Sequence, residues 1–250
     1  MSSQSALAGK SVLVTGAARR VGAAIVRMLH AHGANVLIHH RAAAVAAAEL
    51  AASLNAVRRG SAAVVKAELR EISAHAGLVQ RALSEFGRLD VLVNNASSFY
   101  PTPLGEIAES QWDDLIGSNL KAPLFLSQAV APQLRRTHGL IVNIVDIHAR
   151  RPLKRYTVYC IAKAGLAMLT RSLARELGPD VRVNGVAPGP VLWPEEDIEA
   201  ALKAEIIERT ALKRQGSPED VARAVLFFAC DAPYVTGQIL AVDGGRSIGW

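Results

Sequence analysis

Three side chains in this sequence could perform proton chemistry: Asp146, Tyr159 and Lys163. In the run YCIAK, Tyr159 and Lys163 stand four residues apart, so a helix places the phenol and the ammonium on one face. A tyrosine titrates near ~10 in water, and a neighbouring cation favours its anion, so we expect Lys163 to lower the pKa of Tyr159. The phenol would then donate a proton near neutral pH, which suits reduction of a C=O or C=N bond. Asp146, thirteen residues before Tyr159, adds a carboxylate to the pair.

A glycine turn follows the first predicted strand. The run TGAARRVG, from Thr15 to Gly22, closes that strand and opens a helix. Phosphates bind at such a place because free backbone N–H groups and the helix dipole face them. The run is not GxGxxG, since Arg20 stands where a middle glycine is often found. The turn predicts a nucleotide phosphate site, and an ordinary strand-to-helix turn is the alternative.

The second predicted strand ends in His39, His40 and Arg41. A carboxylate at this point would bind the ribose hydroxyls and favour NAD, but none is present. Arg41, with Arg20 nearby in such a fold, could instead pair with a 2′-phosphate, which predicts NADPH. A solvated arginine is the alternative. The two histidines lack a metal-like third ligand, so we predict no metal site and interpret them as packing or polar contacts.

Apolar runs that fit buried strands alternate with segments that fit helices. The predicted strands are residues 11–15, 35–39, 62–66, 89–94, 140–145, 181–187 and 239–242. The predicted helices are 21–32, 42–57, 75–86, 111–134 with a kink at Pro123, 156–177, and 218–229 with Ser217 as its cap. This alternation demands parallel pairing with right-handed crossovers. It predicts an α/β fold, a single-domain Rossmann-type doubly wound parallel sheet flanked by helices over residues 1–250, with a substrate loop at about 188–212.

Composition narrows the classes of function. The net charge is +6 and the sequence pI is about 9.6, but the arginines come in scattered pairs, which favours an anionic cofactor over a nucleic acid. No apolar run approaches ~20 residues and residues 1–10 lack an apolar signal core, so we expect neither a membrane span nor a signal peptide. Cys160 and Cys230 have no metal-like neighbours, which predicts reduced thiols in a cytoplasmic protein.

Together these segments resemble the short-chain dehydrogenase/reductase family across nearly the entire chain. The matching pieces are TGAARRVG, NNAS at 94–97, Asn119, YCIAK, the Pro188-Gly189 turn and VDGG at 242–245. A closer similarity is to the pteridine reductases of that family, through the His-x-Arg-type strand end, the run NNASSFYPTPL at 94–104 and the aspartate thirteen residues before the tyrosine. The resemblance implies an NADPH-dependent, homotetrameric reductase of pterins or folates.

The resemblance also implies roles for single residues. Tyr159 would donate the proton, Lys163 would lower its pKa and hold the nicotinamide ribose, and Asn119 would support a water chain to that lysine. Asp146 stands where the family usually has a catalytic serine. The implied cofactor-binding residues are Gly16, Arg19, Arg20, Val21, His39, Arg41, Glu68, Leu69, Asn95, Ala96, Ser97, Tyr159, Lys163, Pro188 and Gly189. The implied substrate-binding residues are Arg20, Ser97, Phe99, which would stack on the pterin, Asp146, Tyr159 and Trp193.

Two positions depart from the pteridine reductase pattern. Glu68 stands after the third strand, where those enzymes often have an aspartate near the adenine. It can still accept an amine hydrogen bond, but its reach differs. Ala42 stands where a serine often follows the arginine of the strand end, so one hydrogen bond to a 2′-phosphate would be missing.

Asp146 bears on the identity of the acceptor. An ionised carboxylate only accepts hydrogen bonds, and it would repel the alkoxide that develops when a ketone is reduced. It can hold a tyrosine hydroxyl or a water, and it can accept from the amino groups of a pterin ring. Reduction of a ring C=N needs a proton at nitrogen together with hydride at carbon. We therefore expect a 7,8-dihydropterin or dihydrofolate reductase; a purely structural acceptor at a strand end is the alternative for Asp146.

Two other functions stay open. The first is a short-chain reductase of 3-oxoacyl thioesters, sugars or steroids, against which the absence of the usual serine counts. The second is a non-catalytic NADP(H)-sensing protein, against which the intact Tyr159 and Lys163 count. Trp193, in the loop after Pro190, either lines the substrate mouth or packs the loop itself.

Overall fold

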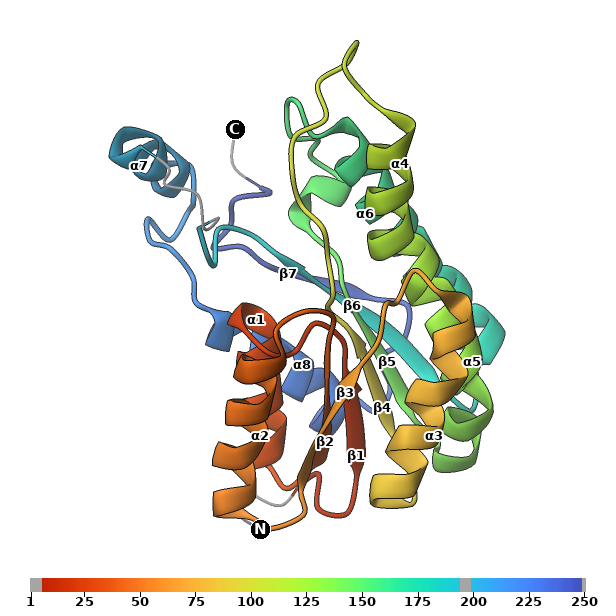
Figure 1. The fold of residues 1–250 in the computed structure, drawn as a ribbon. Coiled ribbons are helices and arrows are strands. Elements are labelled where there is room, and N and C mark those ends of the chain that lie inside the picture. The colour runs from red at the N-terminus through yellow and green to blue at the C-terminus, as the bar shows by residue number, and fades with distance from the viewer. Residues whose placement is uncertain (1–5, 194–198, 249–250) are drawn as a thin grey trace.

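A parallel sheet forms the centre of the molecule (Figure 1). The computed structural model describes residues 6–193 and 199–248. Within these residues the strands are β1 (Ser11–Val14), β2 (Asn35–His40), β3 (Ala62–Lys66), β4 (Val91–Asn94), β5 (Leu140–Ile144), β6 (Arg182–Pro188) and β7 (Ile239–Val242). They pair in parallel in the order β3-β2-β1-β4-β5-β6-β7. The predicted doubly wound sheet is confirmed.

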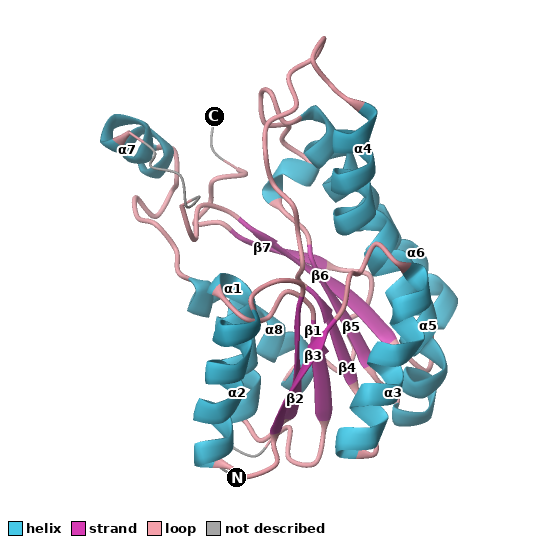
Figure 2. Ribbon diagram, viewed as in Figure 1, coloured by secondary structure: helices cyan, strands magenta, loops and turns pink. Residues whose placement is uncertain are grey.

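Helices cover both faces of the sheet (Figure 2). The α-helices of the described residues are α1 (Arg20–Ala31), α2 (Ala44–Val57), α3 (His75–Phe86), α4 (Glu109–Ile116), α5 (Ala122–Thr137), α6 (Thr157–Leu177), α7 (Ala200–Glu208) and α8 (Pro218–Cys230). The shorter helical turns are η2 (Ile72–Ala74), η3 (Gly117–Lys121) and η4 (Ile147–Ala149). Helices α1, α2 and α8 lie against one face, and α3, α5 and α6 lie against the other.

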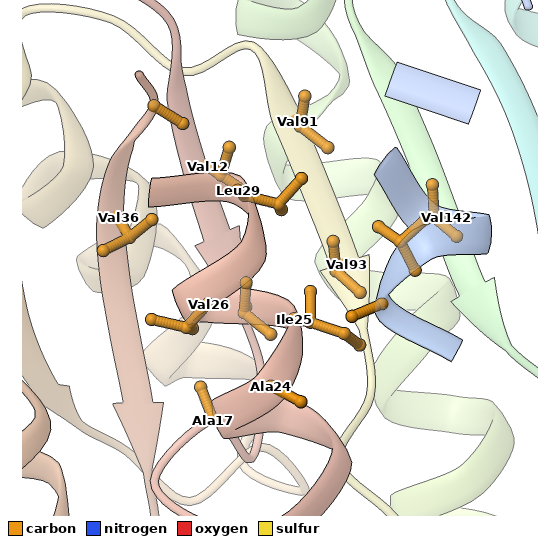
Figure 3. Close-up of a cluster of buried hydrophobic side chains, with 14 of the residues drawn as sticks. Val12, Ala17, Ala24, Ile25, Val26, Leu29, Val36, Val91, Val93 and Val142 are labelled. Carbon is orange, nitrogen blue, oxygen red and sulfur yellow. The ribbon is translucent and has the colours of Figure 1, made fainter. Parts of the chain in front are cut away.

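Alternate residues of each strand supply two apolar cores, one on either face. Val12 and Val14 pack with Ile25 on the α1 side (Figure 3), whereas Leu13 packs with Leu126 on the α5 side. Each fully buried side chain of this size stabilises the fold by roughly 1.5–3 kcal/mol. Because both faces are covered, the strands are continuous apolar runs, as parallel sheets require. The rigid sheet that results fixes the positions of the loops at its edges.

The predicted long helix 111–134 is interrupted by a π-helical turn, which the sequence analysis did not foresee. Helical structure begins at Glu109 and ends at Thr137, but η3 separates α4 from α5. The N–H of Ala122 donates to the carbonyl of Gly117, five residues earlier. Pro123 has no N–H to donate to residue 119, so the regular ladder is broken at this place. The proline therefore accompanies a widened turn, a form that frequently occurs at functional sites.

The last helix begins as predicted. Ser217 Oγ accepts from the Asp220 N–H at 3.3 Å, and the Asp220 carboxylate accepts from the Ser217 N–H at 2.9 Å. This reciprocal pair satisfies two backbone donors that would otherwise face solvent. The predicted substrate loop 188–212 contains α7, and its residues 194–198 lie outside the described residues.

Parallel strands bring their carboxyl ends to one edge of the sheet, and the chemistry-bearing residues gather there. Gly16, His39, Asn95, Asp146 and Gly189 each follow or end a different strand, namely β1, β2, β4, β5 and β6. The order of the strands reverses between β1 and β4, and a crevice forms at such a switch point. Helix α7 and the segment 95–108 stand beyond this edge (Figure 1).

Candidate active site

A cavity of about 850 Å³ opens at the carboxyl edge of the sheet. It is lined by almost every site residue predicted from the sequence: Gly16, Arg19, Arg20, Val21, His39, Arg41, Glu68, Leu69, Asn95, Ala96, Ser97, Phe99, Asp146, Tyr159, Lys163, Pro188, Gly189 and Trp193. Asn119 is fully buried and does not line it. Segments from along most of the chain thus converge on one volume. Among the described residues no group of three or more His, Cys, Asp or Glu side chains could hold a metal, and no helix is long and apolar enough to cross a membrane.

Tyr159 and Asp146 form a direct hydrogen bond in this cavity. The phenol donates to Asp146 Oδ2 at 2.7 Å, and Asp146 Oδ1 accepts from the backbone N–H of His148 at 2.8 Å. Asp146 follows β5 in extended backbone and caps η4, while Tyr159 lies in the first turn of α6. Both carboxylate oxygens therefore have partners, which fixes the orientation of the carboxylate toward the phenol.

The pKa of Tyr159 is raised well above its usual value, so the expected lowering was wrong. Burial of the phenol is the largest cause, and the charge of Asp146 and its hydrogen bond add to it. A carboxylate disfavours a second anion beside it, and an apolar environment disfavours any anion. Tyr159 is consequently held as a neutral phenol, which is the form that carries a proton to give.

Lys163 is also buried, with only 3% of its surface exposed. Its Nζ donates to the carbonyl of Ile144 at 3.0 Å and lies 5.6 Å from the centroid of the Tyr159 ring. Burial lowers the pKa of Lys163 to about 8, and the charge of Asp146 opposes that shift. The ammonium therefore remains mostly charged at neutral pH, yet its main hydrogen bond goes to backbone and not to the phenol.

Asn119 acts on the segment after β4. Its Oδ1 accepts from Ser97 Oγ at 2.6 Å, and its Nδ2 donates to the carbonyls of Ser98 and Leu115 at 2.9 Å. Asn119 lies in the π-helical turn η3, which places its side chain against residues 97–98. The side chain thus holds the loop that leads to Phe99, and its expected support of a water chain to Lys163 stays a prediction.

Phe99 belongs to a cluster of three aromatic rings. Its ring stacks on Tyr156 with centroids 4.6 Å apart, and it meets Tyr159 edge-on at 4.8 Å. Phe99 is 42% exposed and lines the cavity, as does Tyr156. The sequence analysis missed Tyr156, although its position three residues before Tyr159 would have placed both rings on one helical face. The cluster forms an aromatic wall of the cavity next to the Asp146–Tyr159 pair.

The glycine turn fits the diphosphate of a dinucleotide. A Cβ on Gly16 would lie 2.9 Å from the Cα of Ala96, and one on Gly22 would lie 2.7 Å from Asn95 Nδ2, so only glycine permits this close packing. The side chain of Arg19 makes no capping hydrogen bond to α1, and the first residues of this helix line the cavity. The backbone N–H groups of a first helical turn and the helix dipole favour an anion at this point.

Arg20 occupies the left-handed region with φ of 54°, which explains why a glycine is common at its position. Its Nη2 donates to the carbonyl of Trp193 at 2.8 Å. The arginine thereby links the glycine turn to the loop after β6. Another part of the cavity is formed near this loop by Leu202, Glu205, Ile206 and Arg209, all within the predicted substrate loop 188–212, and by Arg246, which the sequence analysis did not identify.

At the opposite end of the cavity, Arg41 and Glu68 lie close together. Arg41 Nη1 is 3.9 Å from Glu68 Oε2, whereas Arg70 contacts the same carboxylate at 3.2 Å. The hydrogen bond from Arg70 is the largest cause that lowers the pKa of Glu68. Glu68 also accepts from the Arg70 N–H at 3.0 Å, so its acceptor sites are shared with that residue. The contact of Arg41 with Glu68 is therefore weak, and the Arg41 side chain is largely exposed. It lies within reach of a bound anion.

A family model described as "Enoyl-(Acyl carrier protein) reductase" matches residues 16–247. All residues that line the cavity lie within this range. The chain belongs to the short-chain dehydrogenase/reductase family. Members of this family are oxidoreductases that use nicotinamide cofactors, and the match extends from the glycine turn to the segment after β7.

Individual relatives within the short-chain dehydrogenase/reductase family differ in their substrates. Pteridine reductase 1 of Leishmania tarentolae is 40% identical over 94% of this chain and 96% of its own length. The granaticin polyketide synthase putative ketoacyl reductase 2 of Streptomyces violaceoruber is 35% identical over 94% of this chain and 95% of its own. A 3-oxoacyl-[acyl-carrier-protein] reductase of Staphylococcus epidermidis is also 35% identical, over 94% and 98%. This chain is therefore a short-chain reductase, similar to enzymes that act on pterins and to enzymes that act on 3-oxoacyl groups.

Proposed function

We propose that the protein catalyses the NADPH-dependent reduction of 7,8-dihydropterins, dihydrobiopterin or dihydrofolate, to their tetrahydro forms. The observation that carries this proposal is the 2.7 Å hydrogen bond from Tyr159 to Asp146 beside the aromatic wall of Phe99. A carboxylate at this position suits a nitrogen-containing ring, which presents N–H and NH₂ donors to it. The aromatic wall suits a flat ring system.

Each site residue would then have a separate role in the reduction. When bound, NADPH would supply hydride to the ring carbon of the C=N bond. Tyr159 holds the proton that the ring nitrogen receives, directly or through a water held by Asp146. Because burial and Asp146 keep the phenol neutral, the proton is present when the acceptor binds. The buried ammonium of Lys163, 5.6 Å from the phenol ring, then stabilises the negative charge that proton transfer leaves on Tyr159.

NADPH is the cofactor that this cavity favours. The uncapped start of α1 and the closely packed glycines fit the diphosphate, and Arg41 offers a cation where a 2′-phosphate would lie. Lys163 and the Pro188-Gly189 turn border the nicotinamide end. We propose that the whole chain works as one such domain in the cytoplasm.

A 3-oxoacyl thioester is the second candidate substrate, since a putative ketoacyl reductase and a 3-oxoacyl-[acyl-carrier-protein] reductase are each 35% identical to this chain. Reduction of a ketone would place a developing alkoxide near Asp146, and like charges repel at this distance. That physical conflict, and the higher identity of the pteridine reductase, favour the pterin. A non-catalytic NADP(H) sensor would not need the buried Tyr159–Asp146 pair.

Parallel assays of NADPH consumption test the proposal, with dihydrobiopterin, dihydrofolate and an acetoacetyl thioester as acceptors. We expect turnover of the pterins and little of the thioester.

Asp146→Ser should reduce kcat/KM for pterins at least about tenfold, the effect of losing one good catalytic interaction, and raise ketone reduction. Asp114→Ser is the matched control, because Asp114 accepts from Tyr100 at 3.1 Å in a second tyrosine–aspartate pair whose members do not line the main cavity. Pterin turnover that survives Asp146→Ser unchanged would contradict the role of the carboxylate, and NADPH binding without turnover would favour the sensor.

A further inference from the structure

His39 joins two parts of the cavity that are far apart in the sequence, the glycine turn and the segment after β3. Its Nδ1 accepts from the Gly16 N–H at 3.0 Å, and its Nε2 lies 3.1 Å from the carbonyl oxygen of Ala67. A carbonyl only accepts and a backbone N–H only donates, so the proton of the ring belongs on Nε2 and Nδ1 is left as the acceptor. One neutral imidazole therefore bridges the phosphate-binding turn and the segment after β3.

The backbone of His39 adds to this bridge. Its carbonyl accepts from the Ala17 N–H at 2.8 Å, so two consecutive residues of the turn are tied to the end of β2. The side chain is only 2% exposed, although one part of it reaches the cavity wall. Burial is the largest cause that lowers the pKa of His39 to about 4, and the charges of His40 and His75 lower it further, against the bond to Ala67 and the charge of Glu68. The ring accordingly stays neutral, and the bridge intact, at physiological pH.

A second histidine holds the same segment from the other side. His75, at the start of α3, is buried, and its Nε2 lies 2.8 Å from the carbonyl of Leu69. Residues Ala67 and Leu69 are thus both anchored, and they flank Glu68 in the cavity wall. The distance between the glycine turn and this wall is fixed by side chains of the protein before any ligand binds. Such preorganisation increases affinity because less freedom is lost on binding.

We propose that His39 is a positioning residue for NADPH: it sets the spacing between the turn that binds the diphosphate and the wall that binds the adenosine. The inference rests on the proposed NADPH site, but not on the proposed acceptor. It replaces the cofactor contact expected for His39 with an indirect role, in which the imidazole acts through Gly16 and Ala67.

Two substitutions of His39 separate the bridge from simple packing. His39→Phe keeps a ring of similar size but removes both hydrogen bonds, whereas His39→Gln keeps one acceptor and one donor. We expect His39→Phe to weaken the Kd of NADPH about tenfold, measured by fluorescence titration without acceptor, and His39→Gln to restore it to within about threefold of wild type. The KM of the acceptor at saturating NADPH should not change.

His40→Phe is the matched control. His40 is an equally buried neighbouring histidine, and among the described residues its Nδ1 has no hydrogen-bond partner. Its loss should leave the Kd of NADPH unchanged. Thermal melting of each variant shows which of them fold.

The inference is overturned if folded His39→Phe binds NADPH like wild type, or if folded His39→Gln binds as weakly as His39→Phe. Nitrogen NMR of ¹⁵N-histidine-labelled wild-type protein tests the tautomer of His39 directly. We expect the His39 signal, assigned by its loss in His39→Gln, to show protonated Nε2 and bare Nδ1 throughout pH 5–8 (roughly the range in which an ordinary histidine titrates). The opposite tautomer, or titration in this range, would also overturn it. Tight NADPH binding without pterin turnover would instead contradict the proposed substrate alone.

Discussion

Tyr159 illustrates how a residue's surroundings decide its chemistry. The helical spacing to Lys163 suggests a phenol with a lowered pKa, because a cation favours the phenolate. In the folded chain the phenol is buried and bonded to Asp146 at 2.7 Å, while the ammonium bonds to the Ile144 carbonyl at 3.0 Å. Burial and the carboxylate therefore outweigh the cation, and the pKa of Tyr159 is raised. Tyr159 is therefore a neutral phenol that carries a proton to donate, not a phenolate that could act as a base.

Replacement of Asp146 by asparagine should lower the pKa of Tyr159 relative to wild type. The amide oxygen can still accept the phenol's hydrogen bond, but the negative charge that disfavours the phenolate is gone. Titration of ¹³Cζ-labelled tyrosine by NMR measures the change, with circular dichroism marking the pH range in which the fold persists. The fully exposed Tyr234 serves as an internal reference in the same spectra. An unaltered Tyr159 titration in this variant would show that the carboxylate does not control the phenol.

At the scale of elements, the start of α1 and the turn η3 carry the features that the sequence patterns did not reveal. Arg20 takes a left-handed backbone conformation in the place of a glycine, and its side chain reaches the loop after β6. Asn119 lies on a π-helical turn and holds Ser97 and Ser98. Both elements have an irregular backbone at a residue that orders a loop of the cavity, as functional sites often do.

Arg20→Gly should stabilise the fold and impair the enzyme. A left-handed conformation costs a residue with a side chain roughly 1–2 kcal/mol, of which about 0.5–1 kcal/mol is returned by the greater freedom of glycine in the unfolded chain. We expect a higher Tm by a few degrees and a higher KM of the acceptor, because the bond to Trp193 is lost.

Arg155→Gly provides the comparison, because Arg155 is exposed, has a φ of 70° and does not line the cavity. Its Tm should rise without any change in KM. Equal kinetic effects of the two substitutions would show that the link from Arg20 to the loop has no role in substrate binding.

At the scale of the whole molecule, the sheet ends in two different edges. β3 forms one edge, and β7 forms the other, with exposed apolar side chains on β7 and the neighbouring α8, among them Phe227 and Leu240. A second apolar set lies on α4, α5 and α6 and includes Trp112, Leu124, Ile161 and Met168. We propose that these two surfaces are each buried against another copy of the chain in the homotetramer that the family resemblance implies.

Light scattering after size exclusion should therefore give four times the 26.6 kDa mass of the chain. Leu240→Lys should yield smaller species, because burial of the β7 edge between two copies would leave the added charge without a partner. Val57→Lys is the control, since Val57 is a more exposed apolar residue at the end of α2. A wild-type mass of one chain, or a tetramer that tolerates Leu240→Lys, would contradict this use of the β7 edge.

The sequence by itself determined the parallel α/β fold and a set of site residues, nearly all of which line the cavity. Strand and helix periodicities are local, and parallel strands necessarily bring their carboxyl ends together, so the residues that follow each strand could be placed in advance. Only the tertiary structure decided how those residues act on one another: the raised pKa of Tyr159, the bridge made by His39 and the position of Asn119 behind the cavity. These depend on burial and on distances between segments remote in sequence, and spacing along the chain carries no measure of either.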